Sequence, residues 1–141
     1  MERTISGMMG KGSVNHNTRA FSAKNVDKER SRDNVDFCHE DIKAVYHELF
    51  DEALERYNAK QKRSDRKIEN YYEKIRQGKQ EKLFYEVIFQ IGNRDDMNVR
   101  SEEGQLAKQI LIDFMTDFQS RNPNLHVFSA HLHMDEETPH I

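Results

Sequence analysis

The segment LHVFSAHLHMDEETPHI, residues 125–141, carries the clearest structural pattern in the chain. We predict a β-strand with one buried face over residues 125–134, because apolar and polar side chains alternate from Phe128 to Met134. Because successive side chains of a strand point to opposite faces, Phe128, Ala130 and Leu132 would turn toward the core. The other face would be polar and would carry Ser129, His131, His133 and Asp135.

Periodic apolar residues upstream of this strand predict the remaining elements. They are a strand within residues 2–10, helices over residues 40–57, 64–78 and 101–118, and a strand over residues 83–91. Ser64 or Asp65 would cap the second helix. This order predicts an α+β fold in which helices pack on one face of a largely antiparallel sheet. Three strands make a narrow sheet, so we expect the sheet to be incomplete in this chain and to continue after residue 141.

The composition limits the classes of protein to which the chain can belong. Its hydrophobic share of 35% is low for a globular domain, where roughly 45–50% is usual, so the core should be thin. The formal net charge of -3 does not by itself indicate nucleic-acid binding, so a basic surface would have to be local. A single cysteine, Cys38, excludes a disulfide framework. With no apolar run that could span a bilayer and no signal peptide, we expect a cytoplasmic protein without a membrane segment.

His133 and His140 are candidate metal ligands, because imidazole is the commonest neutral ligand of metal ions in proteins. Pro139 stiffens the chain before His140, and a turn there could return His140 to the side of His133. Two histidines alone bind metal weakly, and a third ligand is normally needed. From composition alone, a solvated strand end with scattered histidines remains an open alternative.

The string from His131 to Ile141 resembles the third motif of the Mob/Pre family of plasmid mobilisation relaxases, the MobV-type plasmid recombination enzymes. That motif runs His-x-Asp-Glu-x-x-Pro-His, then a hydrophobic residue, then His. The matching positions are His133, Asp135, Glu136, Pro139, His140 and Ile141. The resemblance implies that His133 and His140 bind a divalent ion, manganese or magnesium. It also implies that residue 142 would be the last ligand, and that residues 1–141 form the N-terminal part of a relaxase domain. Glu136 would act in catalysis by orienting a histidine or the water on the metal.

A second short motif, Asn-His-Asn-Thr-Arg at residues 15–19, follows the first predicted strand. By itself such a pattern is more often a polar loop. Mob/Pre proteins carry a His-Asn-x-Arg motif at this place, so the resemblance implies that His16 is the nucleophile and that Arg19 steadies the phosphate or the attacking ring. A neutral imidazole is a competent nucleophile near pH 7, because its unperturbed pKa is about 6.5. The second motif of the family corresponds to Asn34, often followed by a tyrosine. Val35 stands there instead, which excludes a tyrosine nucleophile at that point.

Basic residues cluster in residues 60–67, where only Asp65 opposes them. Such a run is usually a solvated face, but in a DNA enzyme it could follow the phosphates without sequence specificity. The loop from Lys11 to Arg32 is a second candidate, because it must lie near the scissile phosphate if His16 does. The predicted DNA contacts are Lys11, Asn17, Asn34, Arg63, Arg66 and His131, the last of which lies outside the minimal motif.

The resemblance implies a DNA relaxase that nicks and rejoins one strand at a plasmid origin of transfer by metal-assisted transesterification, and so starts conjugative mobilisation or plasmid recombination. Its substrate would be single-stranded or supercoiled plasmid DNA, and a homodimer would form through a region beyond this chain. A rolling-circle replication initiator is one alternative, and it would use Tyr71 or Tyr72 ahead of Lys74. All five tyrosines, however, lie on apolar stripes that are typical of core packing. The other alternative is an inactive, truncated DNA-binding remnant.

Overall fold

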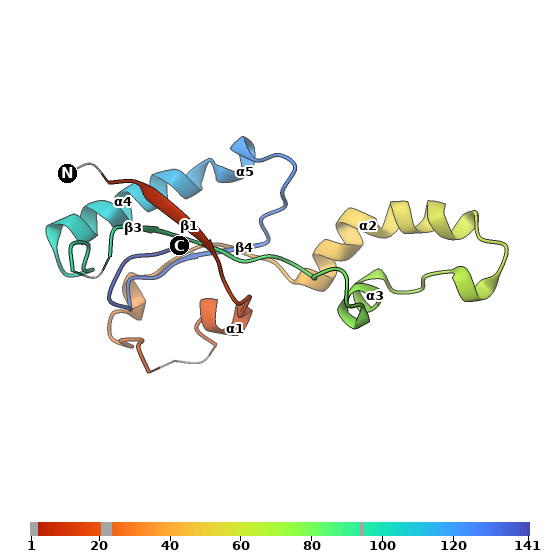
Figure 1. The fold of residues 1–141 in the computed structure, drawn as a ribbon, viewed down its shortest axis with the longest axis horizontal. Helices are drawn as coiled ribbons and strands as arrows, with labels where there is room; N and C mark the ends of the chain where they lie inside the picture. The colour runs from red at the N-terminus through yellow and green to blue at the C-terminus, as the bar shows by residue number, and fades with distance from the viewer. Residues whose placement is uncertain (1–2, 21–23, 94) are drawn as a thin grey trace. The chain divides into compact units, whose positions relative to one another are not determined.

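The chain forms two compact units in a computed structural model that describes residues 3–20, 24–93 and 95–141 (Figure 1). The sheet unit comprises Met1–His39 and Glu86–Ile141, and the helical unit comprises Glu40–Tyr85. Among the helices of the described residues, none is both long enough and apolar enough to cross a membrane.

Two antiparallel strand pairs form the centre of the sheet unit. β1 (Ile5–Met9) pairs with β3 (Val87–Ile91), and β2 (Val35–His39) pairs with β4 (Ser129–Leu132). Two residues near the end of the chain connect the pairs through backbone hydrogen bonds. The N–H of Phe89 in β3 donates to the carbonyl of Ile141 at 2.8 Å, and the N–H of His133 after β4 donates to the carbonyl of His140 at 2.8 Å. The prediction of an α+β fold with antiparallel strands is confirmed.

β2 was not predicted, and its pairing with β4 is irregular. Asp36 lies opposite His131, whereas Cys38 lies opposite Ala130, so Phe37 is the extra residue of a β-bulge. The bulge breaks the strict alternation of apolar and polar residues in a strand of five residues, which hides the strand in the sequence. The three predicted strands therefore become four in the part of the chain that the structure describes.

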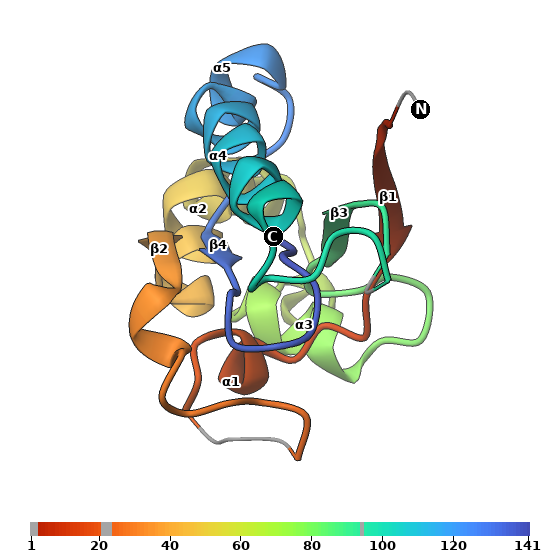
Figure 2. The ribbon, with the colours of Figure 1, turned by 90° about the vertical axis from the view of Figure 1, so that its left-hand side faces the viewer.

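The long helix of the sheet unit covers one face of β4. α4 (Glu102–Thr116) lies on that side, and the four-residue helix α1 (Val14–Asn17) lies on the opposite side (Figure 2). Leu111 of α4 and Leu132 of β4 are fully buried against each other's elements, at 0% exposure. The buried core cluster consists of Ile91, Met97, Ala107, Leu111 and Leu132. A 3-10 turn η1 (Ser31–Asp33) and the short helix α5 (Phe118–Arg121) complete this unit.

Gly104, in the first turn of α4, is expected to tolerate no side chain. A Cβ atom there would lie 1.9 Å from the carbonyl oxygen of Asn98 and 3.0 Å from the Cα of Val99, which are backbone atoms and cannot rotate away. Gly104→Ala should therefore lower the free energy of unfolding by about 1–3 kcal/mol, although alanine normally favours a helix over glycine. Urea unfolding measures the change. Gly78→Ala is the matched control, and an equal loss in both variants would contradict the expectation.

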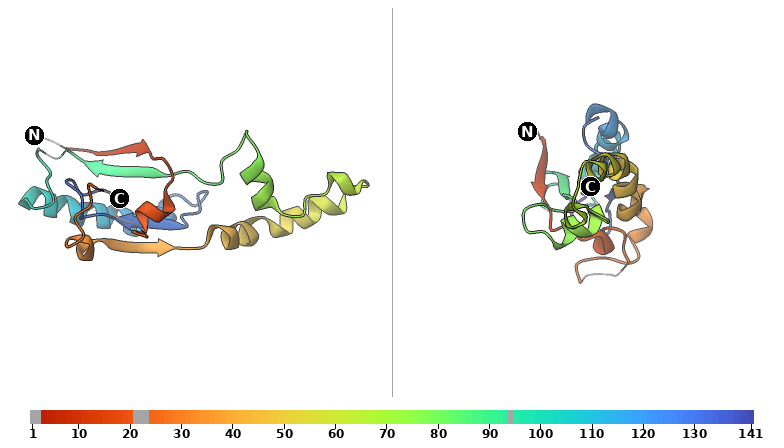
Figure 3. Two further views of the ribbon diagram at one scale, coloured as in Figure 1. Left: turned by 90° about the horizontal axis from the view of Figure 1, so that it is seen from below. Right: turned by 90° about the vertical axis from the view of Figure 1, so that its right-hand side faces the viewer.

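The helical unit contains α2 (Ile42–Ala59), the 3-10 turn η2 (Ser64–Arg66) and α3 (Tyr71–Gln77), with α3 packed beside α2 (Figure 3). The second helix is shorter than predicted, because Asn70 caps it and neither Ser64 nor Asp65 does. Asn58 accounts for the late start. Its side-chain amide bonds both the N–H and the carbonyl of Ile68, which prevents that residue from entering the helical hydrogen-bond pattern.

An aromatic cluster fills the space between α2 and α3. The ring centroid of Tyr46 lies 6.0 Å from that of Tyr71 and 5.4 Å from that of Tyr72. Core packing is thus confirmed for these three tyrosines. It is wrong for Tyr57 and Tyr85, which are 43% and 67% exposed. A unit of this size has too little interior to cover every apolar residue.

Candidate active site

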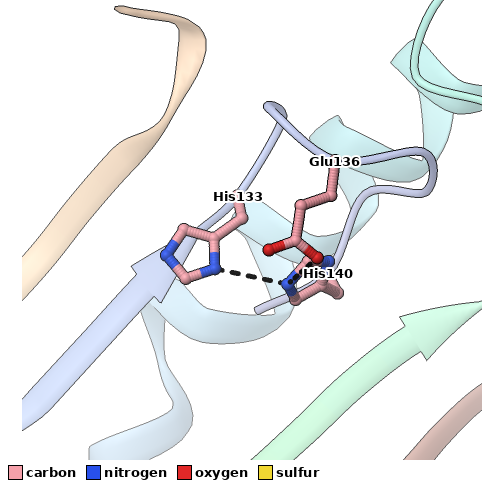
Figure 4. Close-up of side chains that lie close together, drawn as sticks. All are labelled: His133, Glu136 and His140. Carbon is pink, nitrogen blue, oxygen red and sulfur yellow. Dashed lines mark hydrogen bonds and ion pairs between the residues drawn. The ribbon is translucent and has the colours of Figure 1, made fainter. Parts of the chain in front are cut away.

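His133 and His140 lie side by side on the polar face of the sheet unit (Figure 4). His133 follows β4, the chain then turns, and His140 returns antiparallel to it through a backbone bridge. The buried Pro139 precedes His140, as expected for a stiff end of the turn. The Nδ1 atom of His133 lies 3.3 Å from the Nε2 atom of His140. The predicted return of His140 to His133 is therefore observed.

Backbone carbonyls fix the tautomers of both rings. The Nε2 of His133 donates to the carbonyl of Asn17 at 2.8 Å, and the Nδ1 of His140 donates to the carbonyl of Thr138 at 3.0 Å. Burial lowers the pKa of His133 to about 4, so this ring is neutral at pH 7. In the neutral tautomers that these carbonyls select, His133 Nδ1 and His140 Nε2 both carry lone pairs and face each other. Two facing lone pairs are a suitable donor pair for a divalent cation.

The carboxylate of Glu136 completes this donor cluster. Its Oε2 lies 3.6 Å from His140 Nε2, and one donor atom from each of His133, Glu136 and His140 lies within 4.8 Å of the others (Figure 4). Glu136 was predicted to orient a ligand or a water. Its place among the donors also allows it to bind the cation directly.

His16 approaches the cluster from α1, although more than a hundred residues separate them in sequence. Ser13 caps α1 by accepting the N–H of His16 at 3.3 Å, which sets the start of this short helix. The Nε2 of His16 lies 3.4 Å from Glu136 Oε1, and the His16 and His133 ring centroids are 6.3 Å apart. The structure thus brings the two predicted motifs to one place on the polar face.

Arg19 occupies a backbone conformation that normally selects glycine. Its φ is +58°, and the hydrogen bonds from Arg19 N–H to the His16 carbonyl and from Ala20 N–H to the Asn15 carbonyl end α1 in a Schellman motif. A side chain in the left-handed region costs roughly 1–2 kcal/mol. Contacts of the guanidinium offset this cost, because it donates to both carboxylate oxygens of Asp135, at 2.8 and 2.6 Å. Its Nη1 also lies 3.2 Å from His16 Nε2.

Asp135 is the centre of the network and was not predicted as a site residue. It is fully buried at 0% exposure and also accepts hydrogen bonds from Ser31 Oγ at 2.6 Å and Asn34 Nδ2 at 2.8 Å. Burial alone would raise the pKa of Asp135, but the hydrogen bonds from Arg19, Ser31 and Asn34 hold it well below the usual range. The only sequence signal for this residue is its position in the His-x-Asp-Glu motif.

A sequence model of the plasmid recombination enzymes (Mob_Pre) matches residues 9–141 of this chain. The chain belongs to the Mob/Pre family. None of the curated proteins matches it. Two solved structures of the MobM relaxase domain (MOBV; Mob_Pre), both Mn-bound and in complex with plasmid pMV158 oriT DNA, have the same fold. They have a TM-score of 0.52 and 22% and 20% sequence identity, and the match covers 96% of this chain. The chain spans 66% of the length of those domains.

The six residues of this Mob/Pre chain that were predicted to contact DNA differ in their exposure and in their partners within the protein. Lys11 is exposed. Asn17 donates to Glu86 Oε2 at 2.6 Å, and both ends of the Asn34 amide are bonded within the protein, to Asp135 and to the Met134 N–H. His131 is 7% exposed. Arg63 and Arg66 belong to the helical unit, where Arg63 pairs with Asp65 at 2.7 Å. Of the six residues, Asn17, Asn34, Arg63 and His131 therefore have side-chain partners within the protein.

The buried His133 should make the stability of the metal-free protein depend on pH. Its pKa is about 4 in the folded chain and 6.5 when unperturbed, so the unfolded state binds more protons between these values. Stability should therefore fall as the pH drops from 6.5 toward 4, with this residue contributing about 3 kcal/mol. Urea unfolding at several pH values tests this. His133→Gln should flatten the pH dependence, whereas His47→Gln on the surface should not. Equal slopes in the two variants would rule out this origin.

Proposed function

We propose that this protein is the nicking part of a DNA relaxase that cleaves and rejoins one strand at a plasmid origin of transfer. The observation that carries the proposal is the approach of His16 to the cluster of His133, Glu136 and His140, with His16 Nε2 3.4 Å from Glu136 Oε1. The MobM relaxase domain binds oriT DNA, and the membership of this chain in the same family supports the same class of substrate.

His16 would supply the nucleophile. A lone pair of its imidazole attacks the phosphorus in line with the P–O3′ bond, so that an N–P bond forms as the P–O3′ bond breaks. The 3′ oxygen takes up a proton from water and leaves as a hydroxyl, the imidazole releases its N–H proton to water, and the 5′ phosphate stays on His16 as a phosphoramidate. Because the N–P bond retains the free energy of the cleaved ester, a returning 3′ hydroxyl can reseal the strand without ATP. Arg19, 3.2 Å from His16, would steady the phosphate oxygens with its planar fork.

His133, His140 and Glu136 would hold a divalent ion, manganese or magnesium, because their donor atoms converge within 4.8 Å. When bound, the ion would supply Lewis-acid stabilisation of the negative charge on the phosphate oxygens. The hydrogen bond from His133 Nε2 to the carbonyl of Asn17 keeps His133 in the tautomer that such binding needs, since it leaves Nδ1 free of a proton.

We also propose that a histidine at residue 142 would complete this set in a longer chain. His140 and Ile141 are bonded to His133 on one side and to Phe89 on the other, so a strand that continued in this direction would run between β4 and β3. Residue 142 would then share the face of His140, because side chains alternate along a strand.

A nicking assay tests the proposal. A chain containing residues 1–141 is incubated with supercoiled plasmid that carries its origin, with manganese present. We expect relaxed circles whose 5′ end is covalently attached to the protein, and no cleavage when EDTA is added. The linkage should be labile to mild acid, as a phosphoramidate is and a phosphotyrosine is not. An acid-stable linkage, or cleavage that survives EDTA, would overturn the proposal.

The replication-initiator alternative has no specific observation in its favour. It would need Tyr71 or Tyr72 as the nucleophile, and both rings pack against Tyr46 in the aromatic cluster of the helical unit. Cytoplasmic location, and a homodimer formed through a region beyond residue 141, stay predictions.

The basic run of residues 60–67 is proposed as a second contact with DNA phosphates. Arg66 is the best single probe, since Arg63 already pairs with Asp65. Removing one phosphate contact should lower the slope of log affinity against log salt by about 0.9. Fluorescence anisotropy with labelled DNA would therefore show a smaller salt dependence for Arg66→Ala. Arg56→Ala, on an exposed arginine that pairs with Glu52, should leave the slope unchanged. Equal slopes for all three proteins would argue against the contact.

A further inference from the structure

A second hydrogen-bonded cluster lies on the β2–β4 pair and contains none of the proposed metal donors His133, Glu136 and His140. The Oδ1 of Asp36 lies 2.7 Å from Nδ1 of His131, and Nε2 of His131 lies 2.7 Å from Oγ of Ser129. Nδ1 of His39 lies 3.3 Å from the same Ser129 Oγ. These four residues therefore form a continuous chain of hydrogen bonds.

The direction of the hydrogen bonds follows from the carboxylate. Asp36 can only accept, so Nδ1 of His131 donates to it, and in the singly protonated tautomer that this contact selects Nε2 is the acceptor. The hydroxyl proton of Ser129 then points at His131 Nε2. A serine hydroxyl held by an imidazole that a carboxylate orients is the arrangement that activates serine as a nucleophile.

The β-bulge at Phe37 builds this arrangement. Asp36 lies opposite His131, and His39 lies opposite Ser129. Opposite residues of an antiparallel pair share a face, so Asp36 and His39 point the same way although they are three positions apart. A regular strand would send them to opposite faces. Bulges of this kind re-aim side chains and are common next to functional sites.

Burial differs along the cluster in a way that suits a reactive serine. The His131 side chain is only 5% exposed, which shields the base from bulk water, whereas the Asp36 side chain is 76% exposed. Ser129 is partly exposed, so its hydroxyl can be reached from solvent. Within this cluster the histidine is thus shielded from solvent, whereas the serine is accessible to it.

We propose that Ser129, His131 and Asp36 form a second nucleophilic centre, which accepts an acyl group from an activated ester. Ser129 Oγ attacks the ester carbonyl, an Oγ–C bond forms, and the hydroxyl proton passes to His131 Nε2. The C–O bond to the alcohol then breaks, and the alcohol leaves with that proton. Water, deprotonated by His131, releases the acyl group as a carboxylic acid and restores the serine. Asp36 keeps the His131 ring in the required tautomer throughout. The reaction does not depend on strand cleavage and uses neither the proposed nucleophile His16 nor the proposed metal donors His133, Glu136 and His140.

Labelling of the whole chain with a fluorophosphonate probe tests whether Ser129 is an activated nucleophile. The probe forms an Oγ–P bond while its P–F bond breaks and fluoride leaves, and peptide mass mapping locates the adduct. Ser6 is the matched control, because it also lies in a strand of the sheet unit and its hydroxyl donates only to a backbone carbonyl, that of Gln90 at 3.1 Å. We expect Ser129 to react at least about 100-fold faster than Ser6, the lower end of what a positioned base contributes.

Asp36→Asn is the decisive variant, because the exposed position of this side chain lets the amide replace the carboxylate without disturbing the core. The amide would favour the wrong His131 tautomer, so labelling of Ser129 and hydrolysis of p-nitrophenyl acetate should both fall at least about 10-fold. Strand cleavage by the same variant should be unchanged. Labelling of Ser129 no faster than of Ser6, or unaffected by Asp36→Asn, would show that the cluster only stabilises the strand pair and would overturn the proposal.

Discussion

His16→Ala is expected to slow strand cleavage by on the order of 10³-fold or more, because the variant lacks the nitrogen that we propose attacks the phosphorus. The rate should be measured in single turnover on an oligonucleotide that contains the nick site, so that product release does not mask the chemical step. Metal affinity should change little, since the donor cluster consists of His133, Glu136 and His140. A loss of cleavage together with intact metal binding would separate the nucleophile from the cation site.

Two controls make this result interpretable. His47→Ala removes a histidine from the surface of α2, where its side chain is 68% exposed, and should leave cleavage unchanged. Tyr71→Phe removes the hydroxyl that a replication initiator would need. If Tyr71→Phe abolished cleavage and His16→Ala did not, the nucleophile would be the tyrosine and the relaxase assignment of His16 would be wrong.

Elements with long, regular patterns could be predicted from the sequence. The alternation around Leu132 predicts β4, and apolar residues at helical spacing predict α2 and α4. β2 was not predicted, because a bulge at Phe37 interrupts the alternation of apolar and polar residues in this strand. The second predicted helix began too early, at residue 64, whereas α3 begins at Tyr71. Nothing local in the sequence shows that the side chain of Asn58 bonds to Ile68, ten residues along the chain. Local sequence patterns thus predict which helices and strands form, whereas tertiary contacts determine where those elements begin and end.

The candidate site, too, could be predicted from the sequence only in part. The two histidines of the third motif are close in sequence, so a turn through Pro139 was enough to predict that they meet. The approach of His16 depends on how α1 docks, which no spacing encodes. The structural role of Asp135 could not be predicted from the sequence, because its four hydrogen-bond donors come from Arg19, Ser31 and Asn34, about a hundred residues earlier in the chain. A buried carboxylate with that many donors is recognisable only in three dimensions.

Asp135→Ala is expected to lower the free energy of unfolding by about 3–5 kcal/mol, the usual result of removing one partner of a buried ion pair. Asp135 is fully buried, and the Arg19 side chain is 13% exposed, so water cannot easily replace the lost carboxylate. The Ser31 hydroxyl and the Asn34 amide lose an acceptor in the same step. Urea unfolding gives the change. Glu52→Ala is the control, because it breaks an ion pair between side chains that are 66% and 86% exposed and should have little effect.

Asp135→Asn separates the charge of this residue from its shape. The amide oxygen can still accept the hydrogen bonds of Ser31 and Asn34, but the amide nitrogen would face the Nη2 of Arg19, a donor. Stability should therefore lie between that of the wild type and that of Asp135→Ala. Arg19 would lose half of the bidentate contact that holds its unfavourable backbone conformation, and its guanidinium would be less firmly held beside His16. Cleavage should fall with stability in this variant, whereas metal affinity should not. If Asp135→Asn were as stable and as active as the wild type, the carboxylate charge would have no part in positioning Arg19.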